Sequence, residues 1–78
     1  MVYPNPAREG AWIALKHSPA GEVAVRLYDA VGHRVFERTF PEVTNPFYFS
    51  WDMSLQGVYM IQVITGDYTG SQKLLLIH

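Results

Sequence analysis

The sequence predicts an all-β sandwich, and three observations support this fold class. Short segments rich in β-branched and aromatic residues recur along the 78-residue chain, separated by turn signals built on Gly, Pro and Asp. No segment sustains the apolar period of an amphipathic helix. Short strands at regular spacing with turns between them are typical of two packed sheets.

The first predicted strand covers residues 11–16, and a turn follows it. Apolar side chains alternate onto both faces of this segment, which indicates a central strand. Pro19-Ala20-Gly21 forms the turn, because Pro suits the second position of a turn and Gly a later one.

The next two strands are expected to form a hairpin. Residues 22–29 place Val23, Val25 and Leu27 on one face, which is the alternation of a half-buried strand. Residues 29–32 form the turn, since Asp29 can bond the backbone two residues on and Gly32 tolerates a positive φ. Residues 33–40 return as the partner, and Glu37 leaves open which of their faces points inward.

An aromatic strand is expected at residues 47–51, after a loop at 41–46. It places Phe47, Phe49 and Trp51 on one side. Residues 52–56 form a connection with room for one helical turn, and Gly57 closes it.

The final hairpin joins predicted strands at residues 58–65 and 68–77. Gly66-Asp67 gives a tight turn between them, although the usual order of these two residues is reversed. Gly70-Ser71 interrupts the last strand and suggests a β-bulge.

Composition indicates one small domain that must be held together by apolar density. The chain has no cysteine, 49% of its residues are hydrophobic, and 14% are aromatic. A net charge of −1 with scattered Lys and Arg argues against a nucleic-acid or anionic-membrane partner. No apolar run approaches the ~20 residues of a membrane span, so we expect no membrane insertion.

The first residues of the sequence do not form a secretory signal peptide. They lack the basic stretch and apolar core of that kind of targeting segment. Met1 stands directly before a motif-bearing segment, which suggests an excised domain with a start codon added.

The residue types that carry catalysis are present without a catalytic pattern. His17, His33 and His78 are not at metal-ligand spacing to another ligand, so no metal is predicted. Asp29 and Asp52 fall in turns, where Asp caps the backbone. No nucleophile and base are paired, so we expect neither an enzyme nor a bound cofactor.

The aromatic residues allow a second class of function. Tyr48, Phe49, Trp51 and Tyr59 could form a carbohydrate-binding platform. The stronger interpretation is that a small domain without disulfides needs these rings in its core.

The tail, Lys73-Leu74-Leu75-Leu76-Ile77, has two interpretations that can both hold. It can be a core strand buried on both faces, or a recognition strand that a partner engages by edge pairing. In the second case its backbone serves a neighbouring strand on one side and a partner on the other, and Lys73 reaches out of the sheet. The opening Tyr3-Pro4-Asn5-Pro6 is expected to be a rigid segment rather than a ladder strand, because proline removes donors and fixes φ.

Four motifs in order resemble those of the C-terminal sorting domain of the type IX secretion system, in its type A form. The first is Tyr3-Pro4-Asn5-Pro6, which matches the opening YPNP of that family. The second is the strand 25–29 ending at Asp29, with Gly32 and Val35 after it. The third is residues 55–59, with one residue fewer between Leu55 and Gly57 than in the family pattern. The fourth is Gly66 followed by Lys73 and an apolar end, after which His78 departs from the pattern.

This resemblance implies an immunoglobulin-like antiparallel β-sandwich of about seven strands, in which residues 1–78 form a single C-terminal sorting domain. Such a domain directs an attached upstream cargo across the outer membrane. In the family it is read by the translocon once the cargo is in the periplasm, and a sortase-like signal peptidase often removes it. The cargo then stays at the cell surface or is released. The cleavage site would lie upstream of Met1.

The resemblance assigns the signal to the motif positions Tyr3, Pro4, Asn5, Pro6, Asp29, Gly32, Gly57, Tyr59, Gly66, Lys73, Leu74, Leu75, Leu76 and Ile77. The alternative function is an adhesive or carbohydrate-binding sandwich module of an extracellular enzyme.

Overall fold

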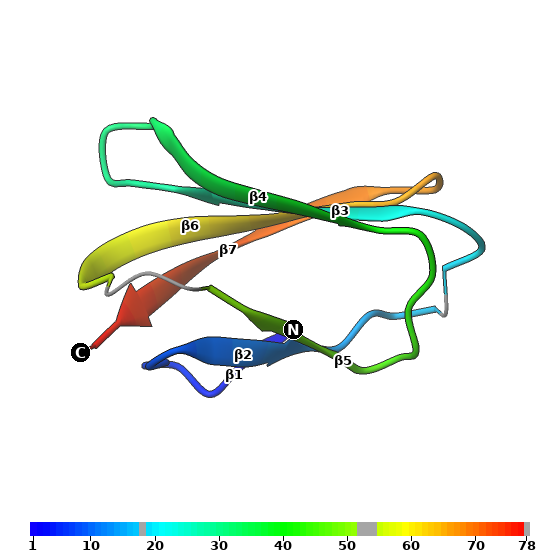
Figure 1. The fold of residues 1–78 in the computed structure, drawn as a ribbon, viewed down its shortest axis with the longest axis horizontal. Helices are drawn as coiled ribbons and strands as arrows, with labels where there is room; N and C mark the ends of the chain where they lie inside the picture. The colour runs from blue at the N-terminus through cyan, green and yellow to red at the C-terminus, as the bar shows by residue number, and fades with distance from the viewer. Residues whose placement is uncertain (18, 52–54, 78) are drawn as a thin grey trace.

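The computed structural model describes residues 1–17, 19–51 and 55–77, and it confirms the all-β sandwich (Figure 1). The strands are β1 (Val2–Tyr3), β2 (Gly10–Ile13), β3 (Val23–Tyr28), β4 (Arg34–Phe40), β5 (Phe47–Ser50), β6 (Gly57–Ile64) and β7 (Thr69–Leu76). They form an antiparallel three-stranded sheet in the order β1-β2-β5 and an antiparallel four-stranded sheet in the order β4-β3-β6-β7. The described residues contain no helix that is long and apolar enough to cross a membrane.

In the three-stranded sheet, β2 is the central strand, as predicted, but it ends at Ile13 rather than residue 16. The Asn45 side chain takes the place of a paired strand at Leu15. The Leu15 N–H donates to Asn45 Oδ1 at 2.9 Å, and Asn45 Nδ2 donates to the Leu15 carbonyl at 2.9 Å. In the register of β2 and β5 the residue opposite Leu15 is Asn45 itself, so its side chain completes this part of the ladder in place of its backbone.

The β3–β4 hairpin settles which face of β4 points inward. Val23, Val25 and Leu27 of β3 are fully buried, as predicted. Glu37 lies outward and bonds Arg26 on the neighbouring strand at 2.7 Å between Nε and Oε2. The inward face of β4 therefore carries Phe36, Arg38 and Phe40, with a register shift between Leu27 and Tyr28.

The β6–β7 hairpin corrects the predicted bulge at Gly70-Ser71. Pairing runs without a shift from Gly57 opposite Leu76 to Ile64 opposite Thr69, so that prediction is wrong. The Gly66-Asp67 turn keeps the strands in register. Thr65 N–H donates to the Tyr68 carbonyl at 2.8 Å, and the Thr65 hydroxyl accepts hydrogen bonds from the N–H groups of both Asp67 and Tyr68 at 3.1 Å.

The core between the sheets is aromatic on one side and aliphatic on the other. Phe49 is fully buried and lies at the centre of the aromatic side, 5.7 Å from Phe36 and 5.9 Å from Trp51 between ring centroids. The Arg38 guanidinium lies 5.9 Å from the Phe49 ring centroid and covers this cluster at the β4 edge. The buried apolar residues are Val2, Ala7, Ala11, Ile13, Val23, Val25, Leu27, Phe47, Phe49, Trp51, Ile61, Val63, Leu74 and Leu76.

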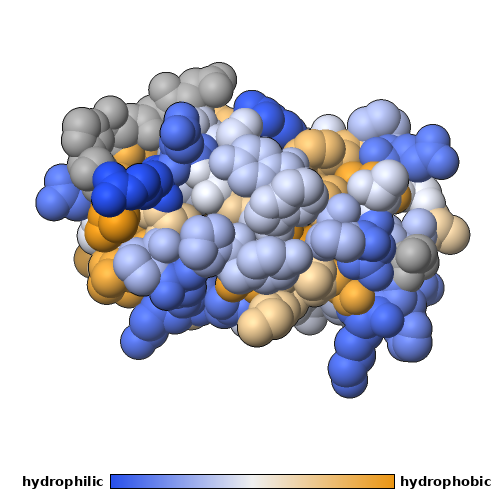
Figure 2. All heavy atoms as spheres, turned by 90° about the horizontal axis from the view of Figure 1, so that it is seen from below, coloured by the Kyte–Doolittle hydropathy of each residue, from blue (hydrophilic) through white to orange (hydrophobic). Residues whose placement is uncertain are grey.

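The four aromatic residues considered as a carbohydrate platform do not share a surface. Phe49 and Trp51 are buried, as the stronger interpretation predicted, and Tyr59 packs against the core. Tyr48 points outward from the three-stranded sheet, where it contacts Trp12 edge to face at 5.4 Å. Seen from that sheet, pale and blue side chains cover most of the surface, and orange hydrophobic patches lie between them (Figure 2). Some predictions concern residues that the structure does not describe. The predicted connection at 52–56, with its possible helical turn, lies partly outside the described residues, and Asp52 and His78 lie wholly outside them.

Candidate functional site

The opening motif and the tail, nearly the whole chain apart in sequence, contact each other. Asn5 Nδ2 donates to the Lys73 carbonyl at 3.2 Å, and the Leu75 N–H donates to Asn5 Oδ1 at 3.0 Å. Ala7 continues this pairing with two backbone hydrogen bonds. Its N–H donates to the Leu75 carbonyl at 2.9 Å, and its carbonyl accepts from the Ile77 N–H at 2.8 Å. Ala7 thus forms a parallel bridge with Leu76. Residues 5–7 therefore occupy the outer edge of β7.

The prediction that a partner pairs with the edge of the tail was wrong, because residues 5–7 of the same chain already occupy the outer edge of β7. Backbone groups of Lys73, Leu75 and Ile77 that point away from β6 bond Asn5 and Ala7. Figure 1 shows β7 running from the four-stranded sheet toward the other sheet, with its C-terminal end beside it. The part of the tail that stays exposed in this fold is the outward face of β7.

The alternation along β7 divides the tail into buried and exposed members. Leu74 and Leu76 are fully buried, while Leu75 is 42% exposed and Lys73 is exposed. Val58 lies opposite Leu75, and Met60 lies opposite Lys73 on β6. Val58 and Met60 are 47% and 38% exposed, so these four side chains form one outward patch, called here the tail face. The expectation of a strand buried on both sides was therefore wrong.

The opening segment is a ladder strand at its first motif residue. Tyr3 belongs to β1 and pairs with Trp12, so the prediction that the whole segment stays outside a ladder was wrong there. Pro4, Asn5 and Pro6 lie outside the strands. The Gln72 side chain holds the outer edge of β1, with Val2 N–H donating to Oε1 at 3.0 Å and Nε2 donating to the Val2 carbonyl at 3.1 Å.

Three carboxamide side chains, Asn5, Asn45 and Gln72, each bond backbone groups as a missing strand would. Asn5 belongs to a motif that the sequence indicated, whereas Asn45 and Gln72 were not predicted as functional residues. Asn5 and Asn45 each precede a proline. Gln72 points to the same inner side of β7 as Leu74 and Leu76, because side chains alternate along the strand. An amide that precedes Pro, or one at an inward strand position, is the signal that could have identified them.

The Asp29 turn has the predicted capping role. Asp29 Oδ1 accepts hydrogen bonds from the N–H of His33 at 2.8 Å and of Val31 at 3.1 Å, and the Gly32 N–H donates to the Asp29 carbonyl at 3.0 Å. Gly32 has a φ of +91°, as its place in the turn predicts. The His33 backbone bond is the main cause that holds the pKa of Asp29 below its ordinary value, while partial burial acts in the opposite direction.

We expect the free energy of unfolding to fall at acid pH because of Asp29. Because the folded protein lowers the pKa of this carboxyl, its contribution is present above the ordinary pKa of about 4 and is lost as pH falls through the folded value. Asp29→Asn keeps an acceptor but cannot titrate. Urea melts of both proteins at neutral pH and near pH 3 should show the wild type losing its advantage at the lower pH. A difference between midpoints that stays constant with pH would contradict this role.

Gly32→Val should destabilise the domain by more than the ~1 kcal/mol of an ordinary surface change, because a β-branched residue at positive φ is a steric outlier. No atom lies within 4 Å of the Cβ position at Gly32, so crowding adds nothing to this backbone effect. Gly66→Val is the matched control, since Gly66 is equally open and lacks a positive φ. Urea midpoints lowered equally in both variants would show that the φ of Gly32 is not the cause.

The signal residues divide between the two ends of the molecule. In Figure 1 the β3–β4 turn, the start of β6 at Gly57 and the end of β7 lie at one end of the long axis. The turn with Gly66 lies at the other end. The structure therefore joins the opening and the tail, places the Asp29 turn at the same end, and leaves Gly66 apart from them.

Within residues 1–17, 19–51 and 55–77, no group of three or more His, Cys, Asp or Glu side chains is placed to hold a metal ion. Neither a curated protein nor a solved structure matches the chain at a significant level.

A comparison with protein families gives one result for nearly the whole chain. The model of the family described as "Secretion system C-terminal sorting domain" matches residues 1–77. That span includes the opening motif, the Asp29 turn and the joined tail. Sorting domains of this family imply an upstream cargo, a contact with the type IX machinery, and export to the cell surface or into the medium. The chain belongs to the family of secretion system C-terminal sorting domains, and it is a C-terminal sorting signal for type IX secretion.

Proposed function

We propose that the export machinery reads the folded domain through the tail face, formed by Val58, Met60, Lys73 and Leu75. The observation that carries this proposal is the alternation on β7, which buries Leu74 and Leu76 fully and leaves Lys73 and Leu75 outward. A buried side chain cannot contact a partner while the domain stays folded. Leu74 and Leu76 therefore hold the strand in place, and their neighbours present the signal.

The chemistry of the tail face fits a protein partner. It combines three apolar side chains with one flexible cation, and the Lys73 stem can reach beyond the sheet. The residues opposite one another on β6 and β7 hold the apolar groups side by side, because cross-strand pairs lie close on one face. An apolar groove with a carboxylate at its rim would complement this surface.

The other motif residues support this surface from within the fold. Asn5 fixes the outer edge of β7 beside Lys73 and Leu75. Tyr59 lies opposite Leu74 and packs against the core, and Gly57 begins β6 with a φ of +115°. Asp29, Gly32 and Gly66 belong to turns. In this proposal these residues determine the shape of the signal, and Lys73 and Leu75 are contacted.

The wider course of export follows from the family resemblance. The translocon would engage the domain once its cargo has reached the periplasm, a sortase-like peptidase would remove the domain, and the cargo would stay at the cell surface or be released. A reporter fused before residue 1 tests this course in a host that carries the system. The reporter found at the surface should have a mass lower than that of the fusion by the mass of the domain. A strain without the type IX system should deliver no reporter. Surface reporter that keeps the domain would exclude removal.

Lys73→Ala should lower delivery of the fused reporter while leaving the fold intact. Lys73 is exposed, so we expect the free energy of unfolding to stay within about 1 kcal/mol of the parent. Urea melts check the fold, and surface reporter measures export.

Thr69→Ala is the matched control for Lys73→Ala, because it truncates another exposed residue of the same strand away from the tail face. It should leave delivery unchanged. If the folded Lys73→Ala protein delivers as much reporter as the parent, Lys73 is not part of the signal.

A further inference from the structure

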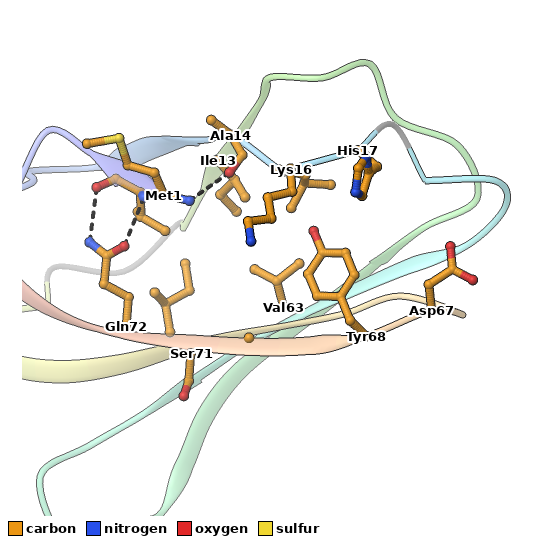
Figure 3. A pocket seen from close by; sticks show the side chains of 14 residues that line it. Met1, Ile13, Ala14, Lys16, His17, Val63, Asp67, Tyr68, Ser71 and Gln72 are labelled. Atoms are coloured by element: carbon orange, nitrogen blue, oxygen red, sulfur yellow. Dashed lines mark hydrogen bonds between the residues drawn. The ribbon is translucent and has the colours of Figure 1, made fainter.

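A cavity of about 490 Å³ opens between the two sheets beside the N-terminus (Figure 3). Ile13 of β2 and Leu15, which follows this strand, line it on one side, and Ile61 and Val63 of β6 line it on the other. The Tyr68 ring rises from the β7 side toward Lys16, and its hydroxyl oxygen is buried with no hydrogen-bond partner among the residues that the structure describes. This volume is within the roughly 300–1,000 Å³ of pockets that hold a ligand, so the cavity has room for a side chain from another segment.

The backbone beside this cavity continues the β1–β2 ladder beyond β1. The Ala14 N–H donates to the Met1 carbonyl at 2.7 Å, and the Met1 amino group donates to the Ala14 carbonyl at 2.6 Å. Leu15 points its backbone groups to the opposite side, where they bond Asn45. In an antiparallel pair alternate residues face the same neighbour. Continuation of this alternation to residue 16 would turn the backbone of Lys16 toward the line along which a chain preceding Met1 would run.

Side-chain alternation places the position directly before Met1 over the cavity. Val2 is 5% exposed and lies opposite Ile13 on the inner face, whereas Met1 is 80% exposed. The position before Met1 would follow Val2 onto the inner face, because side chains alternate along a strand. In the same register it lies opposite Leu15, which packs against the core. Figure 3 shows the Met1 amino group at the edge of this space, with Lys16 and Tyr68 beyond it.

We propose that the polypeptide joined to Met1 extends β1 antiparallel to residues 14–16 and seats an apolar side chain, from the position directly before Met1, in this cavity. This inference depends on the proposed function only in that a sorting domain follows a cargo. The last residues of the cargo segment then belong to the sandwich, and their side chain completes the aliphatic side of its core. The added strand also brings backbone groups to the mouth where the Tyr68 hydroxyl is buried.

Two pairs of extended proteins test the proposal. In the first pair the domain is preceded by Gly-Thr-Val or by Gly-Thr-Asn, so that the two differ directly before Met1, and the uncharged Asn cannot form an ion pair with Lys16 at the cavity. In the control pair it is preceded by Gly-Val-Thr or by Gly-Asn-Thr, which moves the difference to the outward position. Valine should raise the urea midpoint in the first pair, with about a tenfold or larger rise in the folding equilibrium constant, and should have little effect in the control pair.

Two further measurements locate the added segment. Nuclear Overhauser effects (NOEs) should join the methyl groups of the added valine to the Tyr68 ring in the first pair, and the Lys16 amide should exchange with solvent more slowly. Equal midpoints within the first pair, equal effects in both pairs, or absence of these NOEs would overturn the proposal. A midpoint that rises with protein concentration would show that a second copy fills the cavity, which also overturns it. All these measurements use the purified domain and none measures export. A result that overturns this proposal therefore leaves the export test of Lys73→Ala unaffected.

Discussion

Replacing Phe49 with alanine is expected to leave most of the isolated domain unfolded at 25 °C. Truncation of a buried Phe typically costs about 3–5 kcal/mol, and a core of this size supplies only about 3–5 kcal/mol in total. Phe49 is fully buried and packs on rings from β4 of the opposite sheet. Its removal therefore opens a cavity at the point where the two sheets meet. Circular dichroism and urea melts would report the loss.

Tyr48→Ala is the matched control for Phe49→Ala. Tyr48 is the neighbouring residue on the same strand, but it points outward and is 46% exposed. We expect a change of about 1 kcal/mol or less for it, as for surface substitutions away from special features. A Phe49→Ala protein that melts at the urea concentration of Tyr48→Ala would show that the aromatic side of the core is not what joins the sheets.

Replacing Asn5 with alanine should produce the largest loss of export among substitutions outside the tail. The change removes both hydrogen bonds to β7, to the Lys73 carbonyl and from the Leu75 N–H. These bonds are exposed, so the cost in stability should be about 1–2 kcal/mol. The opening segment would then leave the edge of β7 beside the tail face, and the orientation of Lys73 and Leu75 would no longer be fixed. Reporter delivery and urea melts of the same variant measure the two effects.

Asn45→Ala separates signalling from simple destabilisation. Asn45 also makes two hydrogen bonds to backbone, at 2.9 Å each, but its partner is Leu15, which follows β2 of the sheet that does not contain β7. We expect a similar loss of stability and a much smaller loss of delivery. If both Asn variants lose delivery in proportion to their stability, the Asn5 contact matters for folding alone.

The edges of both sheets are covered in the region of the joined ends. Residues 5–7 bond the outer edge of β7, and Gln72 bonds the outer edge of β1. An exposed strand edge is a template for unwanted pairing with another chain. For a chain that must keep its tail ordered beside its partners, covered edges favour recognition through side chains of a face over backbone pairing.

The sequence alone determined the class of fold and most of its strands. Val23, Val25 and Leu27 point inward on β3, Phe47, Phe49 and Trp51 point inward at β5, and Gly32 has the positive φ that its turn needs. These features follow from the spacing of residues i and i+2 or from four residues of a turn, so they are local. The motif order indicated the family for the same reason, and the family match confirmed it.

Other features depended on partners that sequence spacing does not reveal. Glu37 is compatible with either face of β4 until its partner Arg26 is placed across the strand. Gly70 allows a bulge by residue type, but Val63 opposite it stays in register because the Thr65 hydroxyl closes the turn.

Only the tertiary structure showed that the edge of the tail is occupied. The tail has the same apolar pattern whether its outer edge is free or covered, because its own residues do not encode the edge. Asn5 lies 68 and 70 positions from the two residues that it bonds, and a carboxamide can bond any backbone edge within reach. Folding brought those groups together by packing Leu74 and Leu76 between the sheets, which places the backbone of Lys73 and Leu75 beside Asn5.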